Sequence, residues 1–299
     1  MGLNRDYIGK EFPSLEHVVK PEEVAAYALA IGSRNASFFG TNGFDSGLSV
    51  IAPPSFTVTY ELPLLEKVWS DPGLNGGEEQ AKQNVLMLVH GDQNMKFYKP
   101  IKPGDKITYT AKIDDIEDKG SGELLKLSVL SKDEKGEKVT ESHWGLFIRG
   151  IGSGEKPKSS APKAAPAAPP EPPPLAFRDV IRVPGDVTYK YADASNDHNP
   201  IHVNEKVAKE AGLKGINVHG LCTMSMTMKS IIESYLDADP GKLKALGVRF
   251  TAPVYPGDTL IVDGWETGEK NGNSAIAFEV TRESDGVKVI KGGTAEAAL

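Results

Sequence analysis

The sequence predicts an α+β fold made of two copies of one unit, each a long helix followed by an antiparallel sheet. Three observations predict it: an internal repeat, a proline-rich segment that divides the chain, and the same order of helical and strand-like patterns in each half. The repeat is F-x-x-P-[IV]-x-P-G-D, found at residues 97–105 and again at 250–258. Its Pro-Gly-Asp end is typical of a turn, so each copy marks the end of one strand and the start of the next. One such repetition indicates two copies of a unit and not a solenoid.

A proline-rich segment covers residues 155–174, where eight of the twenty residues are proline. Such a segment has few apolar side chains to bury and few backbone donors, so it stays extended and solvated. We therefore expect two domains, residues 1–154 and residues 175–299, joined by a Pro/Ala-rich linker over residues 155–174.

The expected elements follow the same order in both halves. A short helix comes first, over 21–31 and 186–196, and a longer apolar helix follows, over about 53–69 and about 218–235. Strands come next, because runs such as ELLKLSVLSKD and SAIAFEVTRES alternate apolar and polar residues. The expected strands cover residues 85–98, 105–117, 123–133 and 137–149, then 244–253, 257–268, 273–283 and 287–297. In such an α+β layout the sheet can wrap the helix.

Composition limits the function classes. The 299 residues carry a formal net charge of -7, which argues against a nucleic-acid binder because such a protein needs a basic face. The only cysteine, Cys222, has no partner for an intrachain disulfide and fits a reducing compartment.

Location signals are absent from the sequence pattern. No uncharged apolar run reaches the roughly 18–20 residues of a membrane helix, and the N-terminus has no apolar signal core. The C-terminal Ala-Ala-Leu is not the peroxisomal Ser-Lys-Leu address. We expect a cytoplasmic protein without a membrane span, and a peroxisomal location stays open for a eukaryotic source.

The densest group of unusual residues lies between residues 191 and 220, which hold three of the six histidines. Its core is the segment D-H-N-P-I-H at residues 197–202. A purely structural explanation is a helix N-terminus, with Asn199 as N-cap, Pro200 as the first helical residue and a helix that runs through Lys209.

A functional explanation of the same segment starts from Asp197 and His202. A carboxylate and an imidazole on one rigid turn can hold one water molecule from two sides and move its protons. His202 would lie in the first helical turn, where the positive end of the helix keeps the imidazole neutral. A zinc site is the competing explanation, because His198 and His202 are four residues apart. Pro200 separates them, however, and no cysteine or carboxylate set completes the ligands.

A second feature is the glycine-bounded segment 215–220, which precedes the apolar run LCTMSMTMKSII. Glycine at a helix start leaves a backbone N–H open to a ligand oxygen. The alternative is an ordinary helix N-terminus whose methionines pack into the core.

Comparison of the two halves assigns them different roles. In a simple register, Asp197, Asn199 and His202 align with Ser33, Asn35 and Phe38. The first half therefore keeps the turn but lacks the acid/base pair. We expect a catalytic second half and a non-catalytic first half that binds the acyl or CoA part of a ligand, with a groove for a long acyl chain beside PPSFTVTYELPLL.

These residues resemble the MaoC-like, hydratase 2 family of (R)-specific enoyl-CoA hydratases. The stretch YADASNDHNPIHVNEKVAKEAG matches the family signature in residue types and spacing. The resemblance covers both halves, in the two-repeat form that is also the hydratase portion of peroxisomal multifunctional enzyme type 2. One departure is Asn196, where the family usually has glycine, although Asn tolerates left-handed backbone geometry better than most residues.

The resemblance implies a double hot-dog fold, in which a sheet wraps each long helix, and syn hydration of trans-2-enoyl-CoA to (3R)-3-hydroxyacyl-CoA in fatty acid metabolism. It implies that Asp197 and His202 activate the water and that Asn199 helps hold it. It also implies that the N–H of Gly220 stabilises the thioester oxygen. The further ligand contacts that it implies are His90, Gly91, Lys119, His198, Pro200, Ile201 and Phe250.

The resemblance further implies that Lys119 pairs with a CoA phosphate. It implies no metal or redox cofactor, because the thioester itself accepts the electrons, and it implies a homodimer. Three rival functions share the fold: an acyl-CoA thioesterase, a 3-hydroxyacyl-thioester dehydratase that acts on acyl-carrier-protein substrates, and a non-catalytic acyl-CoA-binding subunit.

Overall fold

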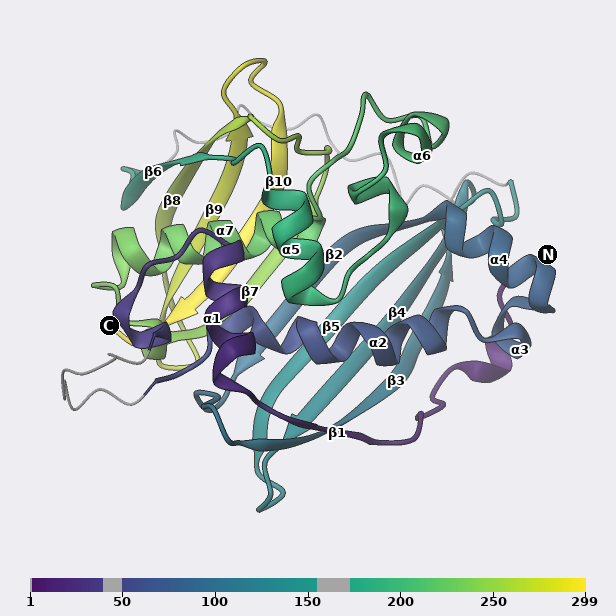
Figure 1. The fold of residues 1–299 in the computed structure, drawn as a ribbon, viewed down its shortest axis with the longest axis horizontal. Helices are drawn as coiled ribbons and strands as arrows, with labels where there is room; N and C mark the ends of the chain where they lie inside the picture. The colour runs from purple at the N-terminus through teal and green to yellow at the C-terminus, as the bar shows by residue number, and fades with distance from the viewer. Residues whose placement is uncertain (1, 40–49, 155–172) are drawn as a thin grey trace.

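The computed structural model describes residues 2–39, 50–154 and 173–299 (Figure 1). Most of the linker predicted over residues 155–174 lies outside the described residues. The expected α+β class is confirmed, because helices lie across one face of a ten-stranded antiparallel sheet.

The first repeat contains more helices than its sequence pattern predicts. Its elements are the 3-10 helix η1 (Arg5–Tyr7), β1 (Leu15–Val18), α1 (Pro21–Ala30), the 3-10 helices η2 (Ala36–Phe38) and η3 (Pro54–Thr57), α2 (Val58–Trp69), α3 (Pro72–Asn75), α4 (Glu78–Met87), β2 (Leu88–Phe97), β3 (Lys106–Asp118), β4 (Gly122–Lys132) and β5 (Lys138–Arg149).

The second repeat follows the same plan. Its elements are β6 (Phe177–Arg182), α5 (Val187–Ser195), the 3-10 helix η4 (Pro200–His202), α6 (Glu205–Glu210), α7 (Gly220–Tyr235), the 3-10 helix η5 (Pro240–Lys242), β7 (Leu243–Phe250), β8 (Thr259–Lys270), β9 (Asn273–Arg282) and β10 (Lys288–Ala297).

The sheet shows the internal repeat directly. Its strand order is β1-β3-β4-β5-β2-β7-β10-β9-β8-β6, so each repeat contributes five adjacent strands and the repeats meet at the antiparallel pair β2·β7. In that pair Asp92 lies opposite Arg249, and Lys96 lies opposite Ala245. When Phe97 is matched to Phe250, as the sequence repeat requires, Asp92 corresponds to Ala245 and Lys96 to Arg249. The two pairings are therefore equivalent positions of the two repeats.

The Pro-Gly-Asp turns adopt one conformation in both repeats. Gly104 and Gly257 have φ of 93° and 89°, which is the left-handed region that glycine tolerates. Gly104 N–H donates to the carbonyl of Val19 at 2.8 Å, and Gly257 N–H donates to that of Val183 at 3.0 Å. The turn therefore ties the start of β3 or β8 to the end of the edge strand beside it.

The double hot-dog arrangement is confirmed. Figure 1 shows α2 and α7 lying across the sheet, with α1 and α5 packed against each other between the two repeats. The methionines of α7, Met224, Met226 and Met228, are buried, as the core explanation predicts. Tyr27 of α1 shares a hydrogen bond of 2.9 Å with Ser225 of α7, which joins the repeats through buried hydroxyl groups.

Two expected elements differ from the structure, and two observed strands were not expected. The helix predicted to run through Lys209 is two elements, η4 and α6, because the Asn204 side chain caps a second helix start by accepting from the N–H groups of Lys206 and Val207. The strand predicted from residue 85 begins at Leu88, since α4 extends to Met87. The edge strands β1 and β6 were not predicted.

Helix α2 buries most of its side chains, and the groove expected beside it stays a prediction. The side chains that α2 buries are Val58, Thr59, Tyr60, Glu61, Leu62, Leu64, Leu65 and Val68. Leu65 and Glu61 have 0% exposed surface, so no void that admits a water adjoins them. Within the described ranges, no helix is long and apolar enough to cross a membrane.

Candidate active site

The predicted acid/base pair lies on a turn between α5 and α6. Helix α5 ends at Ser195, and its C-cap Asn196 has φ of 62° and ψ of 18°, which is the left-handed conformation. The next residues, from Asp197 onward, lead into the single 3-10 turn η4. The side chain of Asn199 caps that turn by accepting from the N–H of Ile201 at 3.3 Å. The cap was predicted, but it begins a short turn and not a long helix.

The departure at Asn196 has a structural explanation. Its left-handed backbone is the conformation that glycine adopts most easily, and Gly32 adopts it at the equivalent place in the first repeat, with φ of 72°. Asn196 Nδ2 also donates to the carbonyl of Thr59 on α2 at 3.2 Å. The asparagine therefore adopts the same left-handed backbone as Gly32 and adds a bond between the repeats.

His202 is a buried, neutral base. Its side chain has 8% exposed surface, and its Nδ1–H donates to the carbonyl of Asn217 at 2.8 Å. Since Nδ1 carries the proton, Nε2 has a lone pair that can accept one. Burial lowers the pKa of His202, and the negative charge of Asp197 opposes that shift. The predicted neutrality is thus due to burial, because His202 is the last residue of a 3-10 turn and not in a first helical turn.

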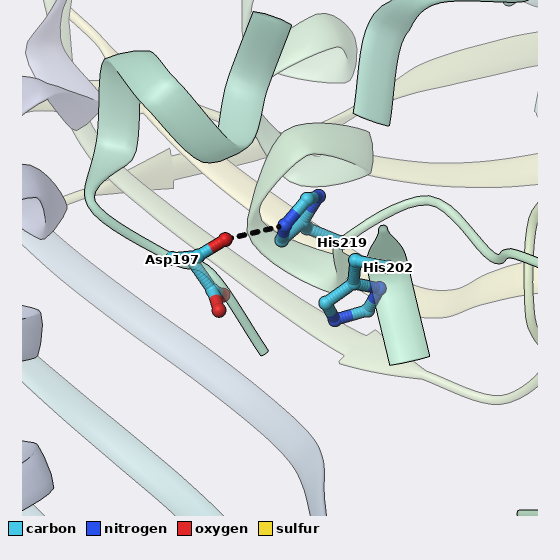
Figure 2. Close-up of side chains that lie close together, drawn as sticks. All are labelled: Asp197, His202 and His219. Carbon is cyan, nitrogen blue, oxygen red and sulfur yellow. Dashed lines mark hydrogen bonds between the residues drawn. The ribbon is translucent and has the colours of Figure 1, made fainter. Parts of the chain in front are cut away.

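Asp197 faces the same space as His202 (Figure 2). Asp197, His202 and His219 each offer a ligand atom, and these atoms all lie within 4.8 Å of one another. The carboxylate is half-buried, and its Oδ1 accepts from the N–H of Asn199 at 3.2 Å. Two of the predicted catalytic side chains therefore meet in one place, close enough to hold a water between them.

His219 belongs to this cluster, and its role was not predicted. It precedes the first residue of α7, and its Nε2–H donates to the backbone carbonyl of Asp197 at 3.0 Å. Its ring centroid lies 3.9 Å from that of His202. Burial, and next the proximity of His202, lower the pKa of His219 to about 2. A neutral His219 therefore links the turn of Asp197 to the start of α7.

The residues that could hold a metal ion differ from the pair considered in the sequence. The pair considered for zinc, His198 and His202, does not form, since His198 is exposed. His219 joins Asp197 and His202 instead, which gives a two-histidine, one-carboxylate set. The backbone bond of His219 uses Nε2, so only its buried Nδ1 remains for a ligand. The expectation that no metal takes part stays a prediction.

Gly220, His90 and Phe250 lie together beside the pair. Gly220 is the first residue of α7, where helix geometry leaves the N–H without an intrahelical partner. The Phe250 ring lies 3.4 Å from the position that a Cβ on Gly220 would occupy. The His90 ring packs edge-on to Phe250 at 5.1 Å and parallel to the Trp144 indole at 5.0 Å. The start of α7 and the strand β2 of the other repeat thus form one wall.

His90 is also held neutral. Its Nε2–H lies 3.1 Å from both the carbonyl of Asp92 and Oε1 of Gln93. Burial lowers the pKa of His90 to about 4, although the negative charge of Asp197 raises it. Burial and the charge of Asp197 likewise raise the pKa of Glu66, which places this α2 residue near the turn. Glu66 was not among the predicted site residues.

The remaining predicted contacts lie at different depths. Pro200 and His198 are exposed, and Ile201 is half-buried. Gly91 lies at a register shift in β2. Lys119 lies in the turn between β3 and β4 and forms an ion pair with Glu117. The ligand roles of these residues stay predictions.

Comparisons with known proteins agree with both repeats. The family model described as the MFE-2 hydratase 2 N-terminal domain matches residues 17–150, and the model of the MaoC-like domain matches residues 167–288. Mouse peroxisomal multifunctional enzyme type 2 is 30% identical over 275 residues, which cover 88% of this chain and 35% of that enzyme. The probable enoyl-CoA hydratase 2 of Dictyostelium discoideum is 28% identical over 295 residues, 96% of this chain and 94% of that protein.

A solved structure supports the fold. The crystal structure of a MaoC-like dehydratase from Phytophthora capsici matches with a TM-score of 0.75 at 24% identity, covering 98% of this chain and 96% of that one. The chain spans about a third of the length of the mouse enzyme but nearly the whole length of the Dictyostelium protein. The resemblance stated from the signature stretch is thereby confirmed.

Proposed function

The chain belongs to the MaoC-like, hydratase 2 family, and we propose that it adds water to trans-2-enoyl-CoA to give (3R)-3-hydroxyacyl-CoA in fatty acid metabolism. The observation that carries this proposal is the meeting of the Asp197 carboxylate and the His202 imidazole within 4.8 Å, beside the start of α7. The (3R) outcome rests on the family resemblance. A cytoplasmic location and a homodimer stay predictions.

His202 has the tautomer that a base requires. Because Nδ1–H donates to the Asn217 carbonyl, the lone pair of Nε2 is available to accept a proton from water. The water oxygen bonds to the β-carbon as its O–H bond breaks, and the proton passes to Nε2. Asp197 accepts the second hydrogen bond of the water and stabilises the imidazolium that forms.

The electron pair of the double bond then moves toward the thioester oxygen. The Gly220 N–H, at the positive end of α7, stabilises the charge that develops on that oxygen in this proposal. Nε2 of His202 returns its proton to the α-carbon from the same face, which completes a syn addition. Atoms balance, since one water is consumed and no other reactant is required.

The test is the loss of enoyl thioester absorbance when the purified protein meets crotonyl-CoA. We expect the absorbance to fall without release of free thiol, and chiral analysis of the product to give the (3R) isomer. Release of CoA thiol at the same rate would select a thioesterase instead. No change with crotonyl-CoA or with longer enoyl-CoA substrates would contradict the proposed function.

A further inference from the structure

His219 contacts three parts of the proposed site at once. Its Nε2–H donates to the backbone carbonyl of Asp197 at 3.0 Å, as Figure 2 shows. Its ring lies against that of His202, with 3.9 Å between the centroids and 32° between the planes. Its own carbonyl carbon is bonded to the nitrogen of Gly220, the proposed oxyanion donor. One residue therefore joins the turn of the carboxylate, the imidazole and the start of α7.

Both the backbone and the ring of His219 are held in place. Its carbonyl accepts from the N–H of Thr223 at 3.0 Å and from the hydroxyl of the same residue at 3.3 Å, within the first turn of α7. The ring packs against Tyr191 of α5 with 5.0 Å between the centroids, and the residue has 1% exposed surface. A bond from this ring therefore holds the Asp197 carbonyl at a fixed place relative to α7.

The two nitrogens of His219 differ in a way that packing alone does not explain. A carbonyl only accepts hydrogen bonds, so Nε2 carries the proton and Nδ1 has a lone pair. Among the described residues this buried Nδ1 has no partner. An unpaired buried acceptor is unfavourable, and a phenylalanine would fill the same space without it. The bond to Asp197 is therefore what distinguishes a histidine here from an apolar side chain.

The first repeat shows that the helix start itself does not need a histidine. In each repeat the residue two places before the helix-start position, Ala52 or Val218, donates its N–H to a carbonyl of the repeated motif. Pro53 therefore corresponds to His219, and its φ of -51° and ψ of 137° nearly equal the -54° and 137° of His219. The backbone is shared, and the histidine occurs only in the repeat that has the proposed acid/base pair.

We infer that His219 is a positioning residue for the proposed hydration: it holds Asp197 beside His202 and ties both to the Gly220 N–H. The inference rests on the proposed function and adds a residue to the same site. His219 itself exchanges no proton, since its Nε2–H stays on the Asp197 carbonyl. The three reacting groups must be in place in one transition state, and a misplacement of about 1 Å can cost about 10² in rate.

The first test separates the hydrogen bond of His219 from its ring. His219→Phe keeps a flat ring against His202 but has no donor, so kcat for crotonyl-CoA should fall by about 10- to 100-fold. The KM should stay unchanged, because positioning acts in the transition state. His219→Gln carries an N–H at the reach of Nε2 and should restore most of the lost turnover. Pro53→Ala is the matched control and should leave kcat unchanged. Equal losses in the Phe and Gln variants would overturn the inference.

The second test asks whether His219 acts through Asp197. In the Asp197→Asn protein the bond no longer positions a carboxylate, so adding His219→Phe should cost much less turnover than it does in the wild-type protein. A side chain that only supports the fold would cost the same in both. The same loss in both backgrounds, measured with crotonyl-CoA, would therefore overturn the inference.

A measurement on the wild-type protein decides the inference even if His219→Phe fails to fold. Nitrogen NMR of protein labelled at the histidine rings should show the Nε2–H tautomer for His219 and the Nδ1–H tautomer for His202. An Nδ1–H tautomer of His219 would overturn the inference. A folded His219→Phe protein with wild-type kcat would also overturn it and leave the proposed function standing. No hydration by the wild-type protein would remove the function, and the inference with it.

Discussion

The turn that follows the first helix has the same backbone in both repeats and different side chains. In the second repeat Asn199 caps η4, and its N–H donates to Oδ1 of Asp197 at 3.2 Å. In the first repeat Asn35 caps η2, and its N–H donates to Oγ of Ser33 at 3.2 Å. The last residue of the turn is His202 in one repeat and the buried Phe38 in the other.

The comparison extends to the starts of α2 and α7. Ala52 N–H donates to the carbonyl of Ile101 at 2.7 Å, and Val218 N–H donates to that of Val254 at 2.8 Å. These two bonds match because Ile101 and Val254 occupy the same place in the repeated motif. Two residues later the first repeat has Pro54 where the second has Gly220. Since proline has no backbone N–H, the first repeat has no counterpart of the proposed oxyanion donor, just as it has none of the proposed acid/base pair.

In the interior, it is the first repeat that has the larger side chain. Gln93 pairs with Trp144, and its counterpart Leu246 pairs with Ala295, so the indole of the first repeat corresponds to a methyl group in the second. The repeat without the proposed acid/base pair thus carries the larger side chain, and that indole packs against the His90 ring. The difference teaches that the proposed reacting groups lie in one repeat, while the other repeat fills the same place in its interior with an aromatic ring.

The largest expected effect comes from removing the pair in the second repeat. Asp197→Asn and His202→Ala should each lower turnover by about 10²–10⁴, because His202 transfers the proton and Asp197 holds the water and stabilises the imidazolium. The matched changes Ser33→Ala and Phe38→Leu should leave turnover unchanged. Steady-state rates with crotonyl-CoA measure the turnover of all four variants. An equal loss of turnover in the Ser33→Ala protein would show that the reacting groups are not confined to the second repeat.

The next largest effect is expected when the start of α7 is given the proline that the first repeat has at the equivalent position. Gly220→Pro should lower turnover by about 10²–10³, the usual loss when one oxyanion donor is removed. The backbone accepts proline there, because His219 has φ of -54° and ψ of 137°, nearly the values of Pro53, which are -51° and 137°. Gly220→Ala keeps the N–H and places its Cβ in ordinary contact with Phe250, so it serves as the control. Similar turnover in the two variants would exclude this N–H from catalysis.

The buried acid of the first repeat gives a pH-dependent contrast. Burial raises the pKa of Glu61 to about 7 from 4.5. Between those values the folded state holds a proton that the unfolded state has released, so stability falls as pH rises, by at most about 1.4 kcal/mol per pH unit. That contribution is fully present below pH 4.5 and is lost above about pH 7.

Glu61→Gln removes this titration, and the second repeat has the uncharged Thr227 at that position. The free energy of unfolding of the variant, from urea titrations at pH 5 and pH 8, should therefore drop less on going to pH 8 than that of the wild-type protein. His90 and His219 titrate in both proteins and cancel in the comparison. Glu79→Gln, at an exposed position, is the control, and an unchanged pH response in Glu61→Gln would show that this carboxyl is ionised throughout.

Features that depend on neighbouring residues in the sequence could be predicted from it. Pro-Gly-Asp turns, alternating strands and Asx caps depend on neighbouring residues, so the repeat, the main strands and the cap at Asn199 were predicted correctly. The short edge strands β1 and β6 have too few residues to show a period. The break after His202 was missed because two asparagine caps lie close together and only packing decides that both are used.

The same distinction applies to the site: contacts within one turn could be predicted, and contacts made by packing could not. Asp197 and His202 share a turn, so their spacing predicts their meeting. His219 reaches Asp197 only because the start of α7 lies beside Tyr191 of α5, and His90 reaches Phe250 only because β2 pairs with β7. No spacing in the sequence carries either contact. The one signal for His219 was its position just before a glycine that begins a helix, and that signal does not name its partner.

The smallest expected effect concerns the caps that the two repeats share. Asn35→Ala and Asn199→Ala should each cost about 0.5–2 kcal/mol of stability, measured by urea unfolding, because each leaves a turn N–H without its acceptor. Asn35→Ala should cost more, since Asn35 Nδ2 also donates to the carbonyl of Ala238 at 2.7 Å. Only Asn199→Ala should also lower turnover, because only its turn places Asp197 against His202. An equally large loss of turnover in Asn35→Ala and Asn199→Ala would contradict this prediction. It would mean that the turn of the first repeat also supports the reaction, through the bond from Asn35 to the second repeat.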